Sequence, residues 1–205
     1  MKGKIISGFF LLVMMAFLPF ISINFVKGHT LETSAPKVNT KSEKAKDTND
    51  ILTGLVAAKY KDNYCDETLK AITIILNTNY KVNQKLFDLT KKEDYLSEKD
   101  FNNSFNEQYD KIRTIVNSVN ETTIVFNNKL QIIPYSETSN GKTITDKNYE
   151  YISAVASPWD CYLDTYNENN HCLGVSLSGL NYLCNNGFNY KKALLWYLPD
   201  CTINE

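Results

Sequence analysis

Residues 122–135 read TTIVFNNKLQIIPY, and this stretch decides the fold class. Two apolar runs, Thr122–Phe126 and Leu130–Tyr135, flank the turn-forming residues Asn127–Lys129, and together they predict a β-hairpin. Helical patterns precede the hairpin and do not alternate with further strands. The sequence therefore predicts a mixed α+β fold and not a doubly wound sheet.

Two helices are predicted upstream of the hairpin. Apolar residues recur at helical spacing over Leu69–Tyr80, with Asp66 or Asn63 available to cap the helix. Phe105–Val119 shows a second amphipathic pattern. Ile51–Ala58 is apolar and suits either a short helix or a short strand.

Two more helices are predicted near the C-terminal end. Ser178–Asn185 has helical spacing and is followed by Gly187, a typical helix stop, and Tyr190–Leu198 ends before Pro199. Between the hairpin and these helices we expect irregular backbone apart from one short element at Tyr149–Ala156.

The N-terminal residues predict a membrane anchor. Ile5–Val26 is largely apolar and uncharged, and it is long enough for a bilayer core, which needs roughly 20 helical residues. Lys2 and Lys4 precede this run, and positive residues stay on the cytoplasmic side, so the rest of the chain is expected outside the membrane. A cleaved signal peptide is the alternative, although no small-x-small pattern follows Phe20.

The expected organisation is an anchor over residues 1–26, a linker over 27–50 and a folded domain over 51–205. The linker segment is polar and poor in aromatic residues, so it cannot bury enough surface to fold alone.

Charge and cysteine content narrow the class of protein. The chain has 22 basic and 23 acidic residues and a formal net charge of −1, which provides no basic surface for nucleic acid. Five cysteines in an extracytoplasmic domain could form disulfides, and the odd number leaves at least one thiol over. The sequence does not determine which cysteines pair.

Three groups of motifs occur in a fixed order in the predicted domain. Together they resemble the stage II sporulation protein D family, the SpoIID/LytB domain, over nearly all of residues 51–203. The motifs are GLVAAKY (54–60) with ETLKA (67–71), then YSETSNGKT (135–143) with SPWD (157–160), and finally HCLGVSLSGLN (171–181) with Tyr190 and Leu195–Pro199.

The resemblance implies a relation to lytic transglycosylases, which cleave peptidoglycan glycan strands. One carboxyl group acts first as general acid and then as general base in that reaction. In the family this is the glutamate of an A-A-E motif, and the matching residue here is Lys59. A lysine ammonium keeps its proton well above pH 7 and repels the cationic transition state, so we expect no catalytic residue at this position.

An active enzyme that uses another carboxylate is the alternative, with Asp62, Asp66 and Glu67 as candidates. The resemblance also implies a set of residues that bind the glycan. They are Ser139, Gly141, Lys142, His171, Gly174 and Ser176.

No metal or other cofactor is expected. Metal-binding family members carry a Cys followed by a His-Cys pair after the first helix, and residues 66–160 contain neither Cys nor His. Cys161, His171 and Cys172 are ligand types that zinc prefers, but their spacing matches no standard zinc pattern. Whether these three bind a metal remains open at this stage.

The resemblance implies a single-pass cell-membrane protein of sporulation (engulfment), with its domain outside the membrane and peptidoglycan glycan strands as its ligand. The amidase and the membrane scaffold of engulfment are implied as further partners. A pure interaction module of the same machinery, without affinity for glycan, is the remaining alternative.

Overall fold

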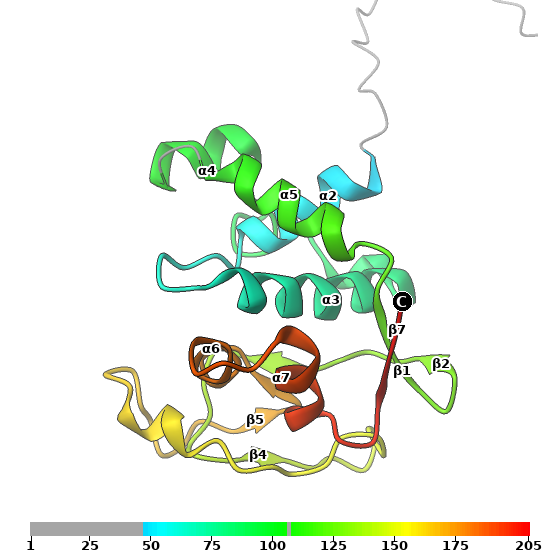
Figure 1. Cartoon of the computed structure of the whole chain (residues 1–205), viewed down its shortest axis with the longest axis vertical. Helices are drawn as coiled ribbons and strands as arrows, with labels where there is room; N and C mark the ends of the chain where they lie inside the picture. The colour runs from blue at the N-terminus through cyan, green and yellow to red at the C-terminus, as the bar shows by residue number, and fades with distance from the viewer. Residues whose placement is uncertain (1–46, 106–107) are drawn as a thin grey trace, which may run out of the picture. The chain divides into compact units, whose positions relative to one another are not determined.

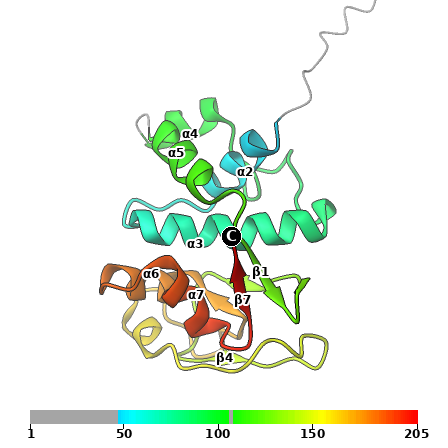
Figure 2. The same cartoon turned by 45° about the vertical axis from the view of Figure 1, so that its right-hand side comes forward.

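A computed structural model describes residues 47–105 and 108–205. Helix α3 (Asp66–Val82) lies between two layers (Figures 1 and 2). One layer consists of α2 (Thr48–Ala57), α4 (Glu98–Phe105) and α5 (Tyr109–Val119). The other contains α6 (Leu177–Asn185), α7 (Tyr190–Tyr197) and short strands. The mixture of helices and small sheets confirms the predicted α+β class.

The predicted membrane anchor lies outside the described residues. Within residues 47–105 and 108–205, no helix combines the length and the apolar character that a bilayer span requires.

Helix α3 forms the centre of the core because it is buried on nearly every side. Residues 71–79 are all buried, although they include the polar residues Thr73, Asn77, Thr78 and Asn79. Its buried threonines satisfy their hydroxyls on the helix backbone: Thr73 donates to the Leu69 carbonyl and Thr78 to the Ile74 carbonyl, both at 2.7 Å. Both neighbouring layers pack on this helix.

The predicted hairpin is present but shorter than expected. Strand β1 (Thr123–Phe126) pairs antiparallel with β2 (Lys129–Leu130) and, on its other edge, with β7 (Thr202–Asn204). Asn127 and Asn128 form the turn with φ of 49° and 59°, a left-handed conformation that asparagine tolerates.

The prediction that the second hairpin strand continues to Tyr135 was wrong. The Asn79 side chain accepts a 2.6 Å hydrogen bond from the Ile133 amide and donates one of 2.9 Å to the Ile133 carbonyl. Pro134 has no amide to offer to a strand partner. The chain therefore leaves β1 and begins a new strand, β3 (Tyr135–Ser136).

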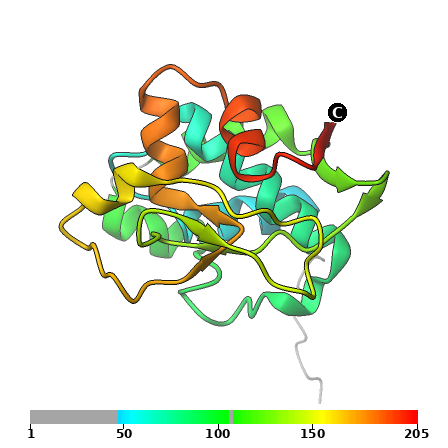
Figure 3. The same cartoon turned by 90° about the horizontal axis from the view of Figure 1, so that it is seen from below.

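Two parallel strand pairs form the far side of the second layer (Figure 3). Strand β3 pairs with β6 (Val175–Ser176), and β4 (Thr143–Ile144) pairs with β5 (Cys172–Leu173). Gly174 joins β5 to β6 with φ of 79°, and a Cβ atom there would lie 2.1 Å from the Pro134 carbonyl oxygen. Only glycine allows the backbone at position 174 to approach the Pro134 carbonyl this closely.

The remaining helix predictions are confirmed with small shifts. Helices α6 and α7 end before Gly187 and Pro199 as expected. The prediction that Asp66 or Asn63 caps α3 was wrong: Asp66 is the first residue of the helix, and Cys65 holds the cap position without a side-chain hydrogen bond. The apolar segment Ile51–Ala58 lies in helix α2 and its C-cap. The predicted helix over Phe105–Val119 is divided: Phe105 ends α4, and α5 begins at Tyr109.

Tyr149–Ala156 forms neither a helix nor a strand, apart from one bridge between Ala156 and Lys142. Tyr151 and Ile152 are buried from this irregular backbone, and the Tyr151 hydroxyl donates to the Ile132 carbonyl at 2.6 Å. Two short 3₁₀ helices complete the described elements, η1 (Gln84–Leu86) and η2 (Pro158–Tyr162).

Candidate functional site

Asp160 is the point at which the later motifs meet. Its Oδ2 atom accepts hydrogen bonds from three serine hydroxyls: Ser139 at 2.6 Å, Ser157 at 2.9 Å and Ser176 at 2.7 Å. The Ser139 amide adds a fourth donor at 3.0 Å. All four residues are fully buried. We call Ser139, Ser157, Asp160 and Ser176 the Asp160 hub.

A series of buried hydrogen bonds extends from the hub to Tyr197 in α7. The Ser157 and Tyr197 hydroxyls lie 2.7 Å apart, and the Trp159 indole donates to the Tyr197 hydroxyl at 3.2 Å. Burial raises the pKa of Tyr197 well above its ordinary value, so the phenol stays neutral. A Cβ atom on Gly179 would lie 2.1 Å from that hydroxyl oxygen, which explains the glycine at this place in α6. A connected buried network of this kind fixes the backbone around it.

The hub contains two of the predicted glycan-binding residues, Ser139 and Ser176. Both hydroxyls are directed to Asp160, and both residues are fully buried, so neither is accessible to a glycan in this arrangement. Ser176 also caps α6, because its hydroxyl accepts the Gly179 amide at 3.1 Å. The structure thus gives these serines a positioning role, and a direct role in binding stays a prediction.

The other predicted binding residues are divided between the interior and the surface. Gly141 joins the hub through its backbone: its amide donates to the Ser139 hydroxyl at 3.2 Å, and its carbonyl accepts the Ser157 amide at 2.8 Å. Gly174 is buried between strands, whereas Lys142 and His171 are exposed. These side chains are not gathered at one surface.

Lys59, which the resemblance in the sequence aligns with a catalytic acid, lies just after α2, and no hydrogen bond joins it to the hub. Its ammonium group donates a 2.7 Å hydrogen bond to the carbonyl of Glu93, in the segment that precedes α4. Lys59 is half-buried. A carboxylate would meet the same carbonyl oxygen unfavourably, so the local backbone suits a cation at this position.

The alternative carboxylates from the sequence have other partners or are exposed. Glu67 pairs with Lys70 at 2.6 Å and accepts the Tyr190 amide, the first of α7, at 2.8 Å. Asp66 pairs with Lys111 at 2.7 Å, and Asp62 is exposed. Glu67 therefore joins α3 to α7, which is a structural contact.

A first polar pocket, the Lys61 pocket, lies beside the α2–α3 loop and has a volume of about 250 Å³. Glu137 stands at its edge, where it pairs with Lys61 and accepts 3.3 Å hydrogen bonds from the hydroxyls of Tyr64 and Ser178. Burial, followed by the charge of Glu137, raises the pKa of Tyr64 well above its ordinary value. The pocket is lined by residues that include Lys61, Tyr64, Asp164, Thr165, Ser178 and Asn181.

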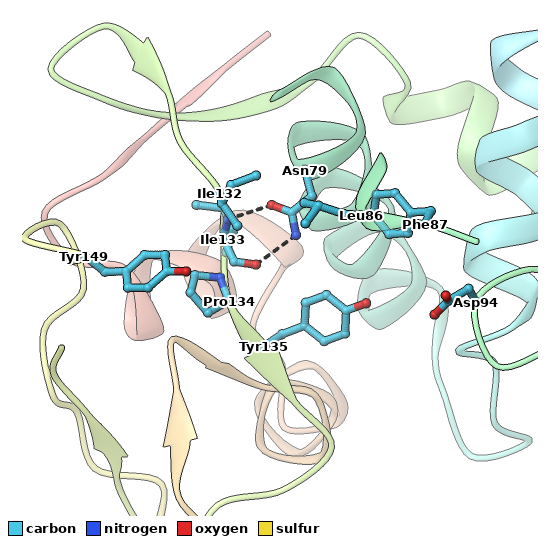
Figure 4. A pocket seen from close by; sticks show the side chains of 9 residues that line it. All are labelled: Asn79, Leu86, Phe87, Asp94, Ile132, Ile133, Pro134, Tyr135 and Tyr149. Carbon is cyan, nitrogen blue, oxygen red and sulfur yellow. Dashed lines mark hydrogen bonds between the residues drawn. The ribbon is translucent and has the colours of Figure 1, made fainter. Parts of the chain in front are cut away.

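A second pocket, the Tyr135 pocket, has a volume of about 270 Å³ (Figure 4). The Tyr135 ring extends from β3 across the pocket in the direction of Asp94, and Asn79 holds the Ile133 backbone behind it. Burial and the Asp94 charge raise the pKa of Tyr135 to about 12, so its hydroxyl remains a neutral donor. The lining includes Asn79, Leu86, Phe87, Asp94, Tyr135 and Tyr149.

Two short segments of the chain each contribute residues to, or next to, both pockets. Tyr135 in β3 lines the Tyr135 pocket, and Glu137, which directly follows the strand, contacts Lys61, Tyr64 and Ser178 of the Lys61 pocket. On the opposite wall, Lys59 bonds to Glu93, the neighbour of Asp94 in the Tyr135 pocket, and precedes Lys61 by two residues. Lys59 thus lies two residues before a residue of one pocket's wall and bonds to the neighbour of a residue of the other, although it lines neither pocket itself.

No three His, Cys, Asp or Glu side chains are grouped for metal binding among residues 47–105 and 108–205. Cys161 and His171 are exposed, whereas Cys172 is buried in β5. Burial raises the pKa of the Cys172 thiol to about 11, which disfavours the thiolate that zinc requires.

Sequence reasoning missed Glu137, Tyr64 and Asp94. Glu137 is inside the segment YSETSNGKT (135–143), and its carboxylate among hydroxyl-bearing residues of that segment was the available signal. Tyr64 and Asp94 lie in loops whose path depends on tertiary packing.

A comparison with family models finds no match, and a comparison with curated proteins finds none either.

Proposed function

We propose that this chain is a membrane-anchored, extracytoplasmic SpoIID-like protein that binds peptidoglycan glycan strands and has little or no lytic activity. Its predicted anchor is Ile5–Val26, with Lys2 and Lys4 on the cytoplasmic side. The glycan is proposed to lie across the Tyr135 pocket and the Lys61 pocket. Sporulation is the proposed context, with the engulfment amidase and membrane scaffold as further partners.

The observation that carries the proposal is that Lys59 bonds to the carbonyl of Glu93, next to Asp94 of the Tyr135 pocket, and precedes Lys61 of the other pocket by two residues. Pyranose rings present apolar faces that stack on aromatic side chains and hydroxyls that bond to polar ones. Tyr135 and Tyr149 supply rings on one side, and Glu137 and Ser178 supply polar groups on the other. A lysine at position 59 supports binding without turnover, because an ammonium group cannot act first as general acid and then as general base in the way that a carboxyl group does.

The Asp160 hub gives further support. It joins segments from all the later motifs by hydrogen bonds that need their serine and aspartate side chains. A functionless surface loop would not require these residue types together. The motifs that carry the family resemblance are thus accounted for as the framework that holds the pocket walls.

Two measurements on the full-length chain in detergent test the proposal. Sedimentation with purified sacculi should show binding, and incubation with denuded glycan strands should release no anhydro-muropeptides. Clear release of anhydro products by the wild-type chain would refute the impaired activity, and failure to sediment with sacculi would refute the glycan affinity.

A second candidate function is that of an active enzyme, in which Glu137 would be the catalytic carboxylate. Glu137 lies at the edge of the Lys61 pocket, and Tyr64 and Ser178 orient it. If anhydro products appear, Glu137→Gln should abolish them and Asp62→Asn should not. Glu67 is the poorer candidate because Lys70 and the Tyr190 amide occupy its carboxylate.

A third candidate, an interaction module, is favoured by an exposed aromatic cluster. Trp159 stacks on Tyr182 with ring centroids 5.1 Å apart and contacts Trp196 at 5.7 Å. Tyr182 is 48% exposed and Trp196 40%. If sacculi are not bound, Trp196→Ala should weaken the retention of the engulfment amidase on the immobilised chain, and Tyr162→Ala should leave it unchanged.

A further inference from the structure

Two cysteines that are far apart in the sequence meet at the first turn of α3. Cys65 precedes the helix and is half-buried, and its Sγ atom lies 3.2 Å from the Thr68 hydroxyl. The same hydroxyl donates to the Asn181 side chain of α6 at 2.8 Å. Asn181 and Cys184 are three residues apart on α6 and share a face of that helix.

The Cys184 side chain closes this arrangement. It is 7% exposed and lies one turn after Asn181, the residue that bonds to Thr68; the Thr68 hydroxyl and the Cys65 thiol are both close enough to affect the pKa of its thiol. No contact with another cysteine is seen for Cys161, Cys172 or Cys201 in the part of the chain that the structure describes. Cys65 and Cys184 differ from the other three cysteines in this respect.

Because Thr68 contacts Cys65 on one side and bonds on the other to Asn181, one turn before Cys184, we infer that Cys65 and Cys184 form a disulfide when the domain meets a small-molecule or protein disulfide as oxidant. The structure has both as free thiols, which is the reduced form. The extracytoplasmic location that would supply such an oxidant belongs to the proposed function, whereas the approach of the two thiols does not depend on it.

The order of the two exchange steps follows from exposure. Cys65 is the accessible thiol, so its thiolate attacks the oxidant, forms a mixed disulfide and expels one thiolate. The Cys184 sulfur then attacks the Cys65 sulfur, gives up its proton, and the second oxidant thiol leaves. Two protein thiols become one disulfide, and one oxidant disulfide becomes two thiols. Burial raises the pKa of Cys184 to about 12, which makes it the second nucleophile and not the first.

The bond would tie together two walls of the Lys61 pocket. Tyr64 adjoins Cys65, Asn181 lies one turn before Cys184, and both line that pocket. A crosslink over such a long loop removes many conformations from the unfolded chain. The oxidised protein should therefore have a pocket fixed by a covalent bond in addition to the Thr68–Asn181 hydrogen bond.

Peptide mapping of the full-length chain in detergent tests this inference. The chain is treated with oxidised glutathione, its remaining thiols are alkylated, and the unreduced digest is analysed by mass spectrometry. We expect one crosslinked peptide pair containing Cys65 and Cys184, with the other three cysteines alkylated. The melting temperature should rise by roughly 5–15 °C on oxidation. Cys65→Ser should abolish both effects, and Cys161→Ser, an exposed matched control, should retain them.

Burial could block the oxidant from a correctly placed pair, so a second arm refolds the denatured chain in a glutathione redox buffer. A stable mixed disulfide on Cys65, a crosslink to another cysteine, or reduced Cys65 and Cys184 after refolding would each overturn the inference. The crosslink can form in a protein that does not sediment with sacculi, in which case the proposed function fails and the disulfide stands.

Discussion

The hydroxyl of Ser139 donates a 2.6 Å hydrogen bond to the carboxylate of Asp160, 21 residues later in the chain, and both residues are fully buried. The contact joins a motif loop to the 3₁₀ turn η2. Since Ser157 and Ser176 donate to the same oxygen, the charge of Asp160 is stabilised by donors from three separate segments. Several testable consequences depend on this contact and on the pockets around it.

Asp160→Asn should destabilise the domain. The amide lacks the charge that strengthens four hydrogen bonds, and its NH₂ group would take the place of Oδ1, which is buried without a partner in the part of the chain that the structure describes. We expect the free energy of unfolding to fall by about 2–4 kcal/mol in urea denaturation. The exposed Asp164→Asn variant should change it by less than about 0.5 kcal/mol. Equal stability of the two variants would contradict a structural role for the hub.

On the proposed relation to lytic transglycosylases, Lys59→Glu should give some lytic activity. The change places a carboxyl group near the segment that holds Asp94 of the Tyr135 pocket, and a general acid of this kind contributes roughly 10²–10⁴-fold to the rate. We expect anhydro-muropeptides from denuded glycan strands with this variant, none with the wild type and none with Lys61→Glu as a control. A folded Lys59→Glu variant without product would show that more than the acid has been lost.

Tyr135→Ala should weaken glycan binding. The Tyr135 ring crosses its pocket, and loss of a stacking surface costs about 1.4 kcal/mol, which is roughly tenfold in affinity. Titration of the full-length chain with sacculi measures the change. Tyr162 is 88% exposed and lines neither pocket, so Tyr162→Ala should bind as the wild type does. An unchanged affinity for Tyr135→Ala would place the glycan elsewhere.

Glu67→Gln should remove an acid-sensitive contribution to stability. Burial raises the pKa of Glu67, but the hydrogen bonds from Lys70 and the Tyr190 amide outweigh it, and the net pKa is lowered. Because the folded value is below the unfolded value of about 4.3, the stabilisation is present above that pH and disappears as pH falls through the folded pKa. We expect a loss of about 1 kcal/mol at pH 7.

Unfolding measured from pH 7 to pH 3 tests this sign. The difference between wild type and Glu67→Gln should shrink on acidification, and the exposed Glu150→Gln variant should show no such trend. A difference that grows as the pH falls would contradict the assigned hydrogen bonds.

The helices could be predicted from sequence because their information is local. Apolar spacing identified α3, and Gly187 and Pro199 marked helix ends that the structure confirms. The second hairpin strand was misjudged because Asn79, more than 50 residues earlier, takes the hydrogen bonds of Ile133. Strand β7 was missed because its partner β1 is nearly 80 residues away in the chain.

The surroundings of the candidate site residues could not be predicted, for a related reason. Ser139 and Ser176 were predicted to bind a ligand, which stays a prediction, and the fold directs their hydroxyls to a buried aspartate that the sequence did not single out. Sequence spacing cannot distinguish a polar side chain that faces a ligand from one that satisfies a buried charge. The pocket groups Glu137 and Tyr64 become neighbours only through packing across 73 residues of chain.

The contacts of α3 with the C-terminal helices also bear on how the domain folds. Thr68 bonds to Asn181 across 113 residues, and Glu67 bonds to Tyr190 across 123. Pairings this distant must close large loops before they add stability, which places the domain among slowly folding topologies. The first turn of α3 lacks these contacts until α6 and α7 have been synthesised and have packed on it. We therefore expect nascent chains that end before α6 to be sensitive to proteases and dependent on chaperones.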